Sequence, residues 1–156
     1  MSGFQNLRLD AQLCFSLYSA TQAITRGYRA RLTGLGLTYP QYLVLVVLWE
    51  VERSTVKGLA DRLRLDSATL TPLLKRMEAA GLVTRTRDTA DQRVVNIALT
   101  AHAREIEPLV ADVQREVACS TGLSLEAFRE LQRSLASLID AMDEDARSCG
   151  DDLPGD

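Results

Sequence analysis

The feature that most constrains this fold is a change of hydrophobic period at Leu82. Upstream of Leu82, apolar residues recur at steps of three and four, as they do on one face of a helix. Downstream, "VTRTR" has a period of two, "DTADQ" is a turn cluster, and "RVVNIALT" is again strand-like. We therefore expect a mainly α chain that carries one small β-hairpin.

Three helices are predicted in the N-terminal part. The first covers about Leu7–Leu32 and is broken by the two glycines of "TGLGL". In the second, "TYPQYLVLVVLWEVE", Thr38 can cap the N-terminus and Pro40 lies in the first turn, where its missing N–H does no harm. The third, "STVKGLADRLRL", is short and is opened by Ser54 or Thr55.

A fourth helix, "DSATLTPLLKRMEAAGL", has two possible starting points. Asp66 or Ser67 can cap it, but Pro72 then lies beyond the first turn and removes one backbone hydrogen bond. A later start at Thr69 would remove this conflict, and the sequence leaves both starts open. Gly81 ends the helix in either case.

Two more helices are predicted after the hairpin. One covers about Ala101–Ala118, with a kink at Pro108, and the other covers about Leu125–Asp145. The last stretch, "RSCGDDLPGD", is acidic and rich in turn formers, so we expect a frayed tail.

Charge is distributed unevenly along the chain. The net charge is only −3, but residues 57–93 contain eight basic and five acidic side chains, which gives +3. Residues 126–156 contain nine acidic side chains and three arginines, which gives −6. A basic middle between acidic flanks indicates one face that binds an anion.

Helix, short helix, turn, helix and hairpin is the order of a winged helix-turn-helix domain. In such a domain the polar N-terminal residues of one helix enter the major groove of DNA, and the hairpin, or wing, reaches the minor groove. The helix residues predicted to contact DNA are Asp66, Ser67, Thr69, Thr71, Lys75 and Arg76, and the wing cations are Arg85, Arg87 and Arg93. The alternative is that both elements are ordinary solvated surface.

The segment "GLADRLRLDSATLTPLLKRMEAAGLVTRTRDTADQRVVNIALT" resembles the core of MarR-family transcriptional regulators. Asp91 and Arg93, followed by "ALT", match that family's wing pattern, in which the arginine enters the minor groove and the aspartate helps to hold the wing. The resemblance covers nearly the whole chain. It implies a homodimer that reads a pseudo-palindromic operator in double-stranded DNA.

The same resemblance divides the chain into parts. Residues 1–35 and 101–146 would form a helical dimerisation region, residues 36–100 the winged helix-turn-helix domain, and residues 147–156 a flexible acidic tail. This division accounts for the apolar faces of the first and last helices, which a lone winged domain would not need.

A narrower resemblance is carried by "QLCFSLY", Tyr28 and "LTYPQYLVLVVLWE". Together they are similar to the organic hydroperoxide resistance regulators, a redox-sensing branch of the MarR family. In that branch an organic hydroperoxide oxidises a cysteine near the start of the first helix, and two tyrosines hydrogen-bond its sulfur. The matching residues are Cys14, Tyr28 and Tyr39. The implied function is a repressor that releases DNA when Cys14 is oxidised.

The spacing of Cys14 and Tyr28 adds an independent constraint. They are 14 residues apart on one predicted helix, which separates them by about 21 Å at about 1.5 Å per residue. A site that contains both must therefore take Tyr28 from the other subunit, and we expect the same of Tyr39. Phenol donors would stabilise a thiolate, which is the form of cysteine that attacks a peroxide.

The other two cysteines carry separate expectations. Cys119 matches the second cysteine of the branch's two-cysteine type, which closes an intersubunit disulfide; the alternative is capping of Cys14 by a small thiol. A disulfide needs α-carbons within about 7 Å, so its closure would move the DNA-binding domains and change their spacing. Cys149 lies in the acidic tail, where we expect a spare exposed thiol.

The remaining features favour no other class of protein. No apolar stretch reaches the length of a membrane span and no signal peptide is recognisable, so a cytoplasmic protein is expected. His102 is the single histidine, and no metal, cofactor or enzymatic activity is predicted. Tyr18 and Tyr42 are interpreted as packing residues. The competing functions are a MarR-type regulator that binds a small phenolic ligand while Cys14 stays inert, and a thiol peroxidase.

Overall fold

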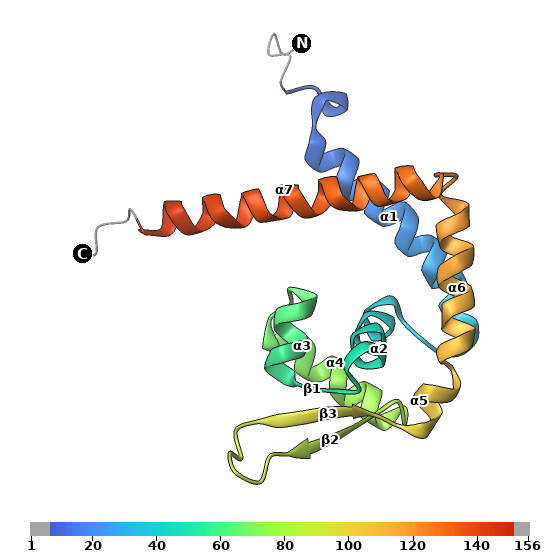
Figure 1. Ribbon diagram of the computed structural model, residues 1–156, viewed down its shortest axis with the longest axis vertical. Helices are drawn as coiled ribbons and strands as arrows, with labels where there is room; N and C mark the ends of the chain where they lie inside the picture. The colour runs from blue at the N-terminus through green and yellow to red at the C-terminus, as the bar shows by residue number, and fades with distance from the viewer. Residues whose placement is uncertain (1–6, 152–156) are drawn as a thin grey trace. The chain divides into compact units, whose positions relative to one another are not determined.

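The computed structural model describes the backbone of residues 7–151 and the side chains of residues 7–145. The chain forms two compact units, and the division between them falls between Val117 and Ala118. In Figure 1 the first unit is a group of helices with a small sheet, and the second is dominated by one long helix, α7. The elements in chain order are η2 (Leu9–Ala11), α1 (Leu13–Leu32), η3 (Thr33–Leu35), α2 (Tyr39–Val51), β1 (Arg53–Thr55), α3 (Val56–Leu63), α4 (Ser67–Ala79), β2 (Val83–Arg87), β3 (Val95–Leu99), α5 (Ala101–Glu105), α6 (Glu107–Ser120) and α7 (Leu125–Asp151).

Helix α1 begins at Leu13, so the predicted start near Leu7 is wrong. Gln12 has an extended backbone, with φ −89° and ψ 109°, and separates α1 from the short 3-10 helix η2. From Leu13 the helix continues without a break to Leu32. Cys14 therefore lies in the first turn of α1.

Helix α2 lies at the centre of the hydrophobic core. Its start is fixed as predicted, because the Gln41 side chain accepts the N–H of Thr38 at 2.8 Å and Pro40 occupies the first turn. The largest fully buried side chains come from α2 itself, from α1, α3, α4 and α6, and from the sheet: Leu32, Val44, Leu45, Leu48, Leu59, Leu70, Leu74, Met77, Val83, Ile97 and Val110. One core therefore unites α1, the winged region and α6 up to Val117.

Helix α4 begins at the earlier of its two possible starts. The Asp66 carboxylate accepts the N–H of Thr69 and caps the helix, so the alternative start at Thr69 is wrong. Pro72 consequently lies inside α4. Because proline has no N–H, the carbonyl of Ala68 loses its usual helical donor.

The predicted hairpin is confirmed, and a third strand joins it. Strands β2 and β3 pair antiparallel, with Arg85 opposite Ile97. Strand β1 pairs antiparallel with the other edge of β3, which gives the order β1-β3-β2. Thr55 ends β1 and caps α3, since its side chain accepts the N–H of Gly58 at 3.0 Å. A strand of three residues is too short to have an alternating signature in the sequence.

The single helix predicted over Ala101–Ala118 is in fact two helices. Helix α5 ends at Glu105 and α6 begins at Glu107, next to Pro108, whose missing N–H predicted a distortion at this point. Helix α6 ends at Ser120, beyond the predicted end.

The second unit consists of the end of α6, a short connection and α7. The Ser124 hydroxyl accepts the N–H of Ala127 at 3.2 Å and fixes the start of α7. Helix α7 continues to Asp151, beyond the predicted end at Asp145. The first residues of the expected tail over 147–156 are therefore helical, and positions 152–156 lie outside the described residues.

Large apolar side chains remain exposed on α1 and α7. They are Leu13, Phe15, Tyr18 and Ile24 on α1, and Leu125, Leu131, Ile139 and Met142 on α7. Apolar surface of this extent is typical of a protein–protein interface. The predicted fold class, mainly α with a small β-hairpin wing, is confirmed.

Candidate nucleic-acid interface and candidate redox site

The first turn of α4 presents several of the predicted DNA-binding side chains to solvent. Ser67 and Thr69 are exposed. Asp66 is exposed as well, but its carboxylate is engaged by the N–H of Thr69, and this hydrogen bond lowers the pKa of the carboxyl. Thr71 is half-buried, and its hydroxyl donates to the carbonyl of Ser67 at 2.7 Å. Ser67 and Thr69 thus present the exposed hydroxyls of this turn.

The loop of the wing is organised by Asp88. Its Oδ1 accepts the N–H of Ala90 at 2.9 Å and of Asp91 at 3.2 Å, and its Oδ2 accepts the Asn96 side-chain amide at 3.3 Å. These hydrogen bonds lower the pKa of the Asp88 carboxyl, with the Ala90 N–H as the largest cause. Asp91 accepts the N–H of Arg93 at 2.9 Å and shapes the tip.

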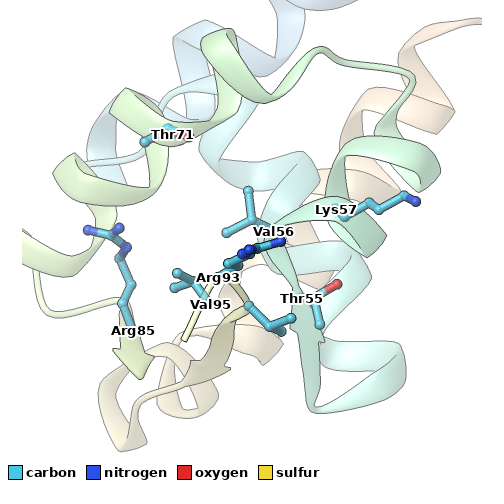
Figure 2. Close-up of a pocket in the computed structure, with 8 residues that line it drawn as sticks. Thr55, Val56, Lys57, Thr71, Arg85, Arg93 and Val95 are labelled. Atoms are coloured by element: carbon cyan, nitrogen blue, oxygen red, sulfur yellow. The ribbon is translucent and has the colours of Figure 1, made fainter. Parts of the chain in front are cut away.

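The predicted cations differ in their surroundings. Exposed cations are found at Lys75, Arg76, Arg87 and Arg93. The Arg85 side chain is only 21% exposed and forms an ion pair with Glu78 of α4 at 3.3 Å. Its Nε is buried without a hydrogen-bond partner among the described residues. Figure 2 shows Arg85 directed from β2 toward α4, so this side chain ties the wing to α4.

A cavity of about 440 Å³ opens between the start of α3, α4 and the wing (Figure 2). It is lined by Thr55, Val56, Lys57, Thr71, Arg85, Arg93, Val94 and Val95. Three of these eight side chains are cationic and none is acidic, so the cavity attracts anions. Lys57 was not among the predicted contacts, although it opens the basic segment of the sequence.

Tyr28 and Tyr39, which were expected to share a site, lie side by side. Their ring centroids are 5.2 Å apart. The ring of Tyr42 lies 4.9 Å from Tyr28 and 5.7 Å from Tyr39, and its hydroxyl is 3.4 Å from that of Tyr28. Burial is the main cause that raises the pKa of both Tyr39 and Tyr42. These two phenols are therefore neutral hydrogen-bond donors at physiological pH.

Cys14 lies apart from this tyrosine cluster within one chain. It is exposed, and because α1 is continuous from Leu13 to Leu32, Cys14 and Tyr28 are separated by about 21 Å of helix. The structure therefore brings the two expected tyrosines together and leaves the cysteine at the opposite end of α1.

The other two cysteines lie in the second unit. Cys119 is exposed in the last turn of α6, not after the helix as predicted. Cys149 falls within α7, but its side chain lies outside the described residues.

The described part of the chain has no group of three or more His, Cys, Asp or Glu side chains that could hold a metal ion. No single described helix combines the length and apolar character needed to cross a membrane. The segments Leu13–Leu35 and Tyr39–Val51 reach that threshold only when joined across a 79° bend, and α2 is largely buried in the core.

Comparison with known proteins identifies the relatives of this chain. Residues 37–95 match the sequence profile of the MarR family. The chain is 48% identical to the HTH-type transcriptional regulator TtmR of Methylorubrum extorquens. The 146 aligned residues cover 94% of this chain and 74% of TtmR. It is 40% identical over 139 residues to the organic hydroperoxide resistance transcriptional regulator of Bacillus subtilis, with 89% of this chain and 95% of that protein covered. The chain belongs to the MarR family.

Solved structures agree with this assignment. Reduced AbfR bound to DNA is 37% identical, with a TM-score of 0.70 over 86% of this chain and 96% of AbfR. The disulfide form of AbfR, a protein of Staphylococcus epidermidis, is 36% identical, with a TM-score of 0.63 over 86% of this chain and 95% of AbfR. This MarR-family chain is therefore a transcriptional regulator of the MarR type.

Besides Lys57, three residues that contact the predicted site residues or shape the wing were not identified from the sequence. Asp88 opens a turn cluster, and an aspartate at that position commonly accepts backbone N–H groups. The sequence therefore contained a signal for its role in holding the loop of the wing. Tyr42 lies three residues after Tyr39 and so shares its helix face. Glu78 meets Arg85 across a helix-to-strand turn, and no spacing rule predicts that pair.

Proposed function

We propose that this chain is a DNA-binding transcriptional repressor that senses organic hydroperoxides through Cys14. The observation that carries the proposal is the arrangement of α1, which holds Cys14 exposed at one end and Tyr28, beside Tyr39, at the other. Two copies packed antiparallel through α1 would place the sulfur of one copy against the phenols of the other. The 40% identity to a Bacillus subtilis regulator named for organic hydroperoxide resistance supports this function.

Dimerisation supplies the second chain that this site needs. The exposed apolar side chains of α1 give each copy a surface that a partner would bury. We assign residues 1–35 and 101–146 to the dimerisation region and residues 36–100 to the DNA-binding domain. A two-fold axis between the copies would suit a pseudo-palindromic operator.

The contacts with DNA follow from the exposed side chains of α4 and the wing. Helix α4 would enter the major groove with Ser67 and Thr69, while Arg93 and Arg87 of the wing approach the minor groove. The cationic cavity beside Lys57 would face the phosphate backbone between the two grooves. The likeness to AbfR, which has been solved on DNA, supports this arrangement.

Oxidation is proposed to proceed in two steps. The Cys14 thiolate attacks one oxygen of the hydroperoxide, the O–O bond breaks, the sulfur becomes a sulfenic acid, and the alkoxide leaves and takes up a proton. The Cys119 thiolate of the other copy then attacks that sulfur, a disulfide forms as the S–O bond breaks, and the hydroxide leaves and takes up a proton to become water. Closing this disulfide would shift the DNA-binding domains and change the half-site spacing. The solved disulfide form of AbfR supports the second step.

The decisive experiment measures release from operator DNA. The operator is first selected from random duplexes by binding to the protein, and release by cumene hydroperoxide is followed by fluorescence anisotropy. Wild type and the matched control Cys149→Ser should both be released, whereas Cys14→Ser should stay bound. If Cys14→Ser is released as readily as wild type, Cys14 is not the sensor, and the alternative of a phenolic ligand becomes the better account.

Non-reducing electrophoresis after hydroperoxide treatment tests the role of Cys119. Wild type and Cys149→Ser should give a cross-linked dimer band that Cys119→Ser lacks. A band that survives the Cys119→Ser change would remove Cys119 from the mechanism and assign the disulfide to Cys149. Continuous consumption of hydroperoxide with a thiol reductant would favour a thiol peroxidase instead.

A further inference from the structure

The tyrosine cluster contains one phenol more than the proposed function uses. Tyr28 is 9% exposed and Tyr42 is 7% exposed, and their rings stack at 4.9 Å with an interplanar angle of 30°. Within the described part of the chain, the hydroxyl of Tyr42 has one hydrogen-bond partner, the hydroxyl of Tyr28 at 3.4 Å. Packing alone would be served equally well by phenylalanine, so the buried hydroxyl of Tyr42 needs an explanation.

The number of protons in the cluster limits how its hydroxyls can be arranged. A neutral phenol donates one hydrogen bond and can accept others. If Tyr28 gives its proton to a sulfur, its oxygen can only accept in the contact with Tyr42. Tyr42 must then donate its proton to Tyr28, and Tyr28 must donate its own proton to the sulfur. The opposite order, in which Tyr28 donates to Tyr42, would leave Tyr28 without a proton for the sulfur.

We propose that Tyr42 is a positioning residue of the redox site: its hydroxyl donates to Tyr28 and keeps the Tyr28 proton directed at Cys14 of the second copy. This inference rests on the proposed function. Tyr42 does not touch the sulfur, and it acts through Tyr28 alone. Helix α2 places it for this role, because Tyr42 follows Tyr39 by three residues and so faces Tyr28 from the same side.

The size of the effect follows from the kind of bond involved. Hydrogen bonds in a chain polarise one another, so a donor to Tyr28 strengthens the bond that Tyr28 itself donates. The separation of 3.4 Å is long for two hydroxyls, so we expect this bond to shorten when Tyr28 faces a thiolate. Loss of one neutral hydrogen bond corresponds to about a threefold to tenfold change in rate.

The experiment compares Tyr28→Phe, Tyr42→Phe and the double variant in the full chain, with Cys119→Ser and Cys149→Ser present so that Cys14 is the one thiol. The rate of sulfenic acid formation with cumene hydroperoxide is measured across pH by trapping with dimedone. Alkylation by iodoacetamide, which also needs the thiolate, is measured in parallel. Thr25→Val is the control, because it removes a hydroxyl from α1 whose partners among the described residues are carbonyls of the same helix, those of Thr21 and Gln22.

The expected result is that Tyr42→Phe slows both reactions by about threefold to tenfold and moves the pH profile upward. It should have no further effect when Tyr28 is already phenylalanine, and Thr25→Val should behave as wild type. A Tyr42→Phe rate equal to or faster than wild type would overturn the inference, and so would an equal slowing in the Tyr28→Phe background. If Tyr28→Phe itself has no effect, the proposed redox site shared between the two copies is wrong. That result differs from one in which only the role of Tyr42 is wrong.

Discussion

At the scale of single residues, Arg85 and Arg87 look equivalent in the sequence but have different surroundings in the structure. Both lie on β2, and the two-residue period places them on the same face of the strand. Only Arg85 is within reach of Glu78 on α4, which leaves its side chain 21% exposed. Arg87 lies further along the strand and stays exposed. Charge counting alone could not distinguish the residue that braces the wing from the residue that is proposed to meet DNA.

The salt dependence of operator binding separates these two arginines. Arg87→Gln should reduce the slope of log affinity against log salt by about 0.9, which corresponds to one phosphate contact. Arg85→Gln should weaken binding with a smaller change of slope, because its main partner is Glu78. Affinity is measured by anisotropy at several salt concentrations. Equal changes of slope would mean that Arg85 contacts a phosphate directly in the complex.

Asp88 should make the stability of the wing sensitive to acid. The pKa of its carboxyl is lowered by folding from the ordinary value of 3.8, so the stabilisation is complete above that value and is lost as the pH falls through the folded pKa. The difference in free energy of unfolding between wild type and Asp88→Ala should therefore be larger at pH 6 than at pH 3. Urea unfolding at both pH values measures it.

Asp88→Asn is the control for this prediction. It keeps an acceptor oxygen for the N–H groups of Ala90 and Asp91 but cannot ionise. At pH 6 it should therefore lower the free energy of unfolding by less than Asp88→Ala does. If the difference in free energy of unfolding between wild type and Asp88→Ala is the same at pH 3 and pH 6, the ionised carboxylate does not stabilise the wing.

At the scale of elements, the sequence predicted what periodicity and caps encode and missed what depends on tertiary pairing. The hairpin and the distortion near Pro108 were predicted because each has a local cause, and the cap at Asp66 was one of the starts that the sequence left open. Strand β1 exists only because β3 offers it an edge, and three residues carry no pattern of their own. The start of α1 was misplaced because apolar spacing continues through Leu9, whereas the backbone is extended at Gln12.

The candidate site divides in a similar way. Tyr28 and Tyr39 were identified by resemblance, and the structure places them together. The contact of Tyr42 with Tyr28 joins two helices across the core, and the contact of Glu78 with Arg85 joins a helix to a strand. Neither pair can be predicted from spacing along one element.

Pro72 destabilises α4, because it removes one backbone hydrogen bond from the interior of the helix. Replacing it with alanine restores the N–H that the Ala68 carbonyl lacks, so Pro72→Ala should raise the free energy of unfolding by roughly 1–2 kcal/mol. Urea unfolding at equal protein concentration measures this difference. Pro40→Ala is the control, because Pro40 lies in the first turn of α2, where no N–H is missed. A neutral or destabilising Pro72→Ala would show that packing of α4 requires the proline.

At the scale of the whole molecule, the exposed apolar face of α1 should control assembly. Ile24 is 43% exposed in the single chain, and a glutamate at that position would place an unpaired charge in the proposed interface. Ile24→Glu should weaken dimerisation by at least about tenfold, as measured by sedimentation equilibrium. Ala23→Glu adds the same charge at an exposed position of the same helix, about 80° around it from both Leu13 and Phe15, and should leave the dimer intact. An unchanged dimer in Ile24→Glu would exclude this face.

The length of α1 has one more consequence, for mixtures of chains. Because the helix keeps Cys14 and Tyr28 of the same copy about 21 Å apart, each proposed sensor takes its sulfur from one gene product and its phenol from the other. A heterodimer of one Cys14→Ser chain and one Tyr28→Phe chain then contains one sensor with both defects and one with none. Two alleles that are each impaired should therefore complement one another when they are expressed together, because half of the sensors in every heterodimer are intact.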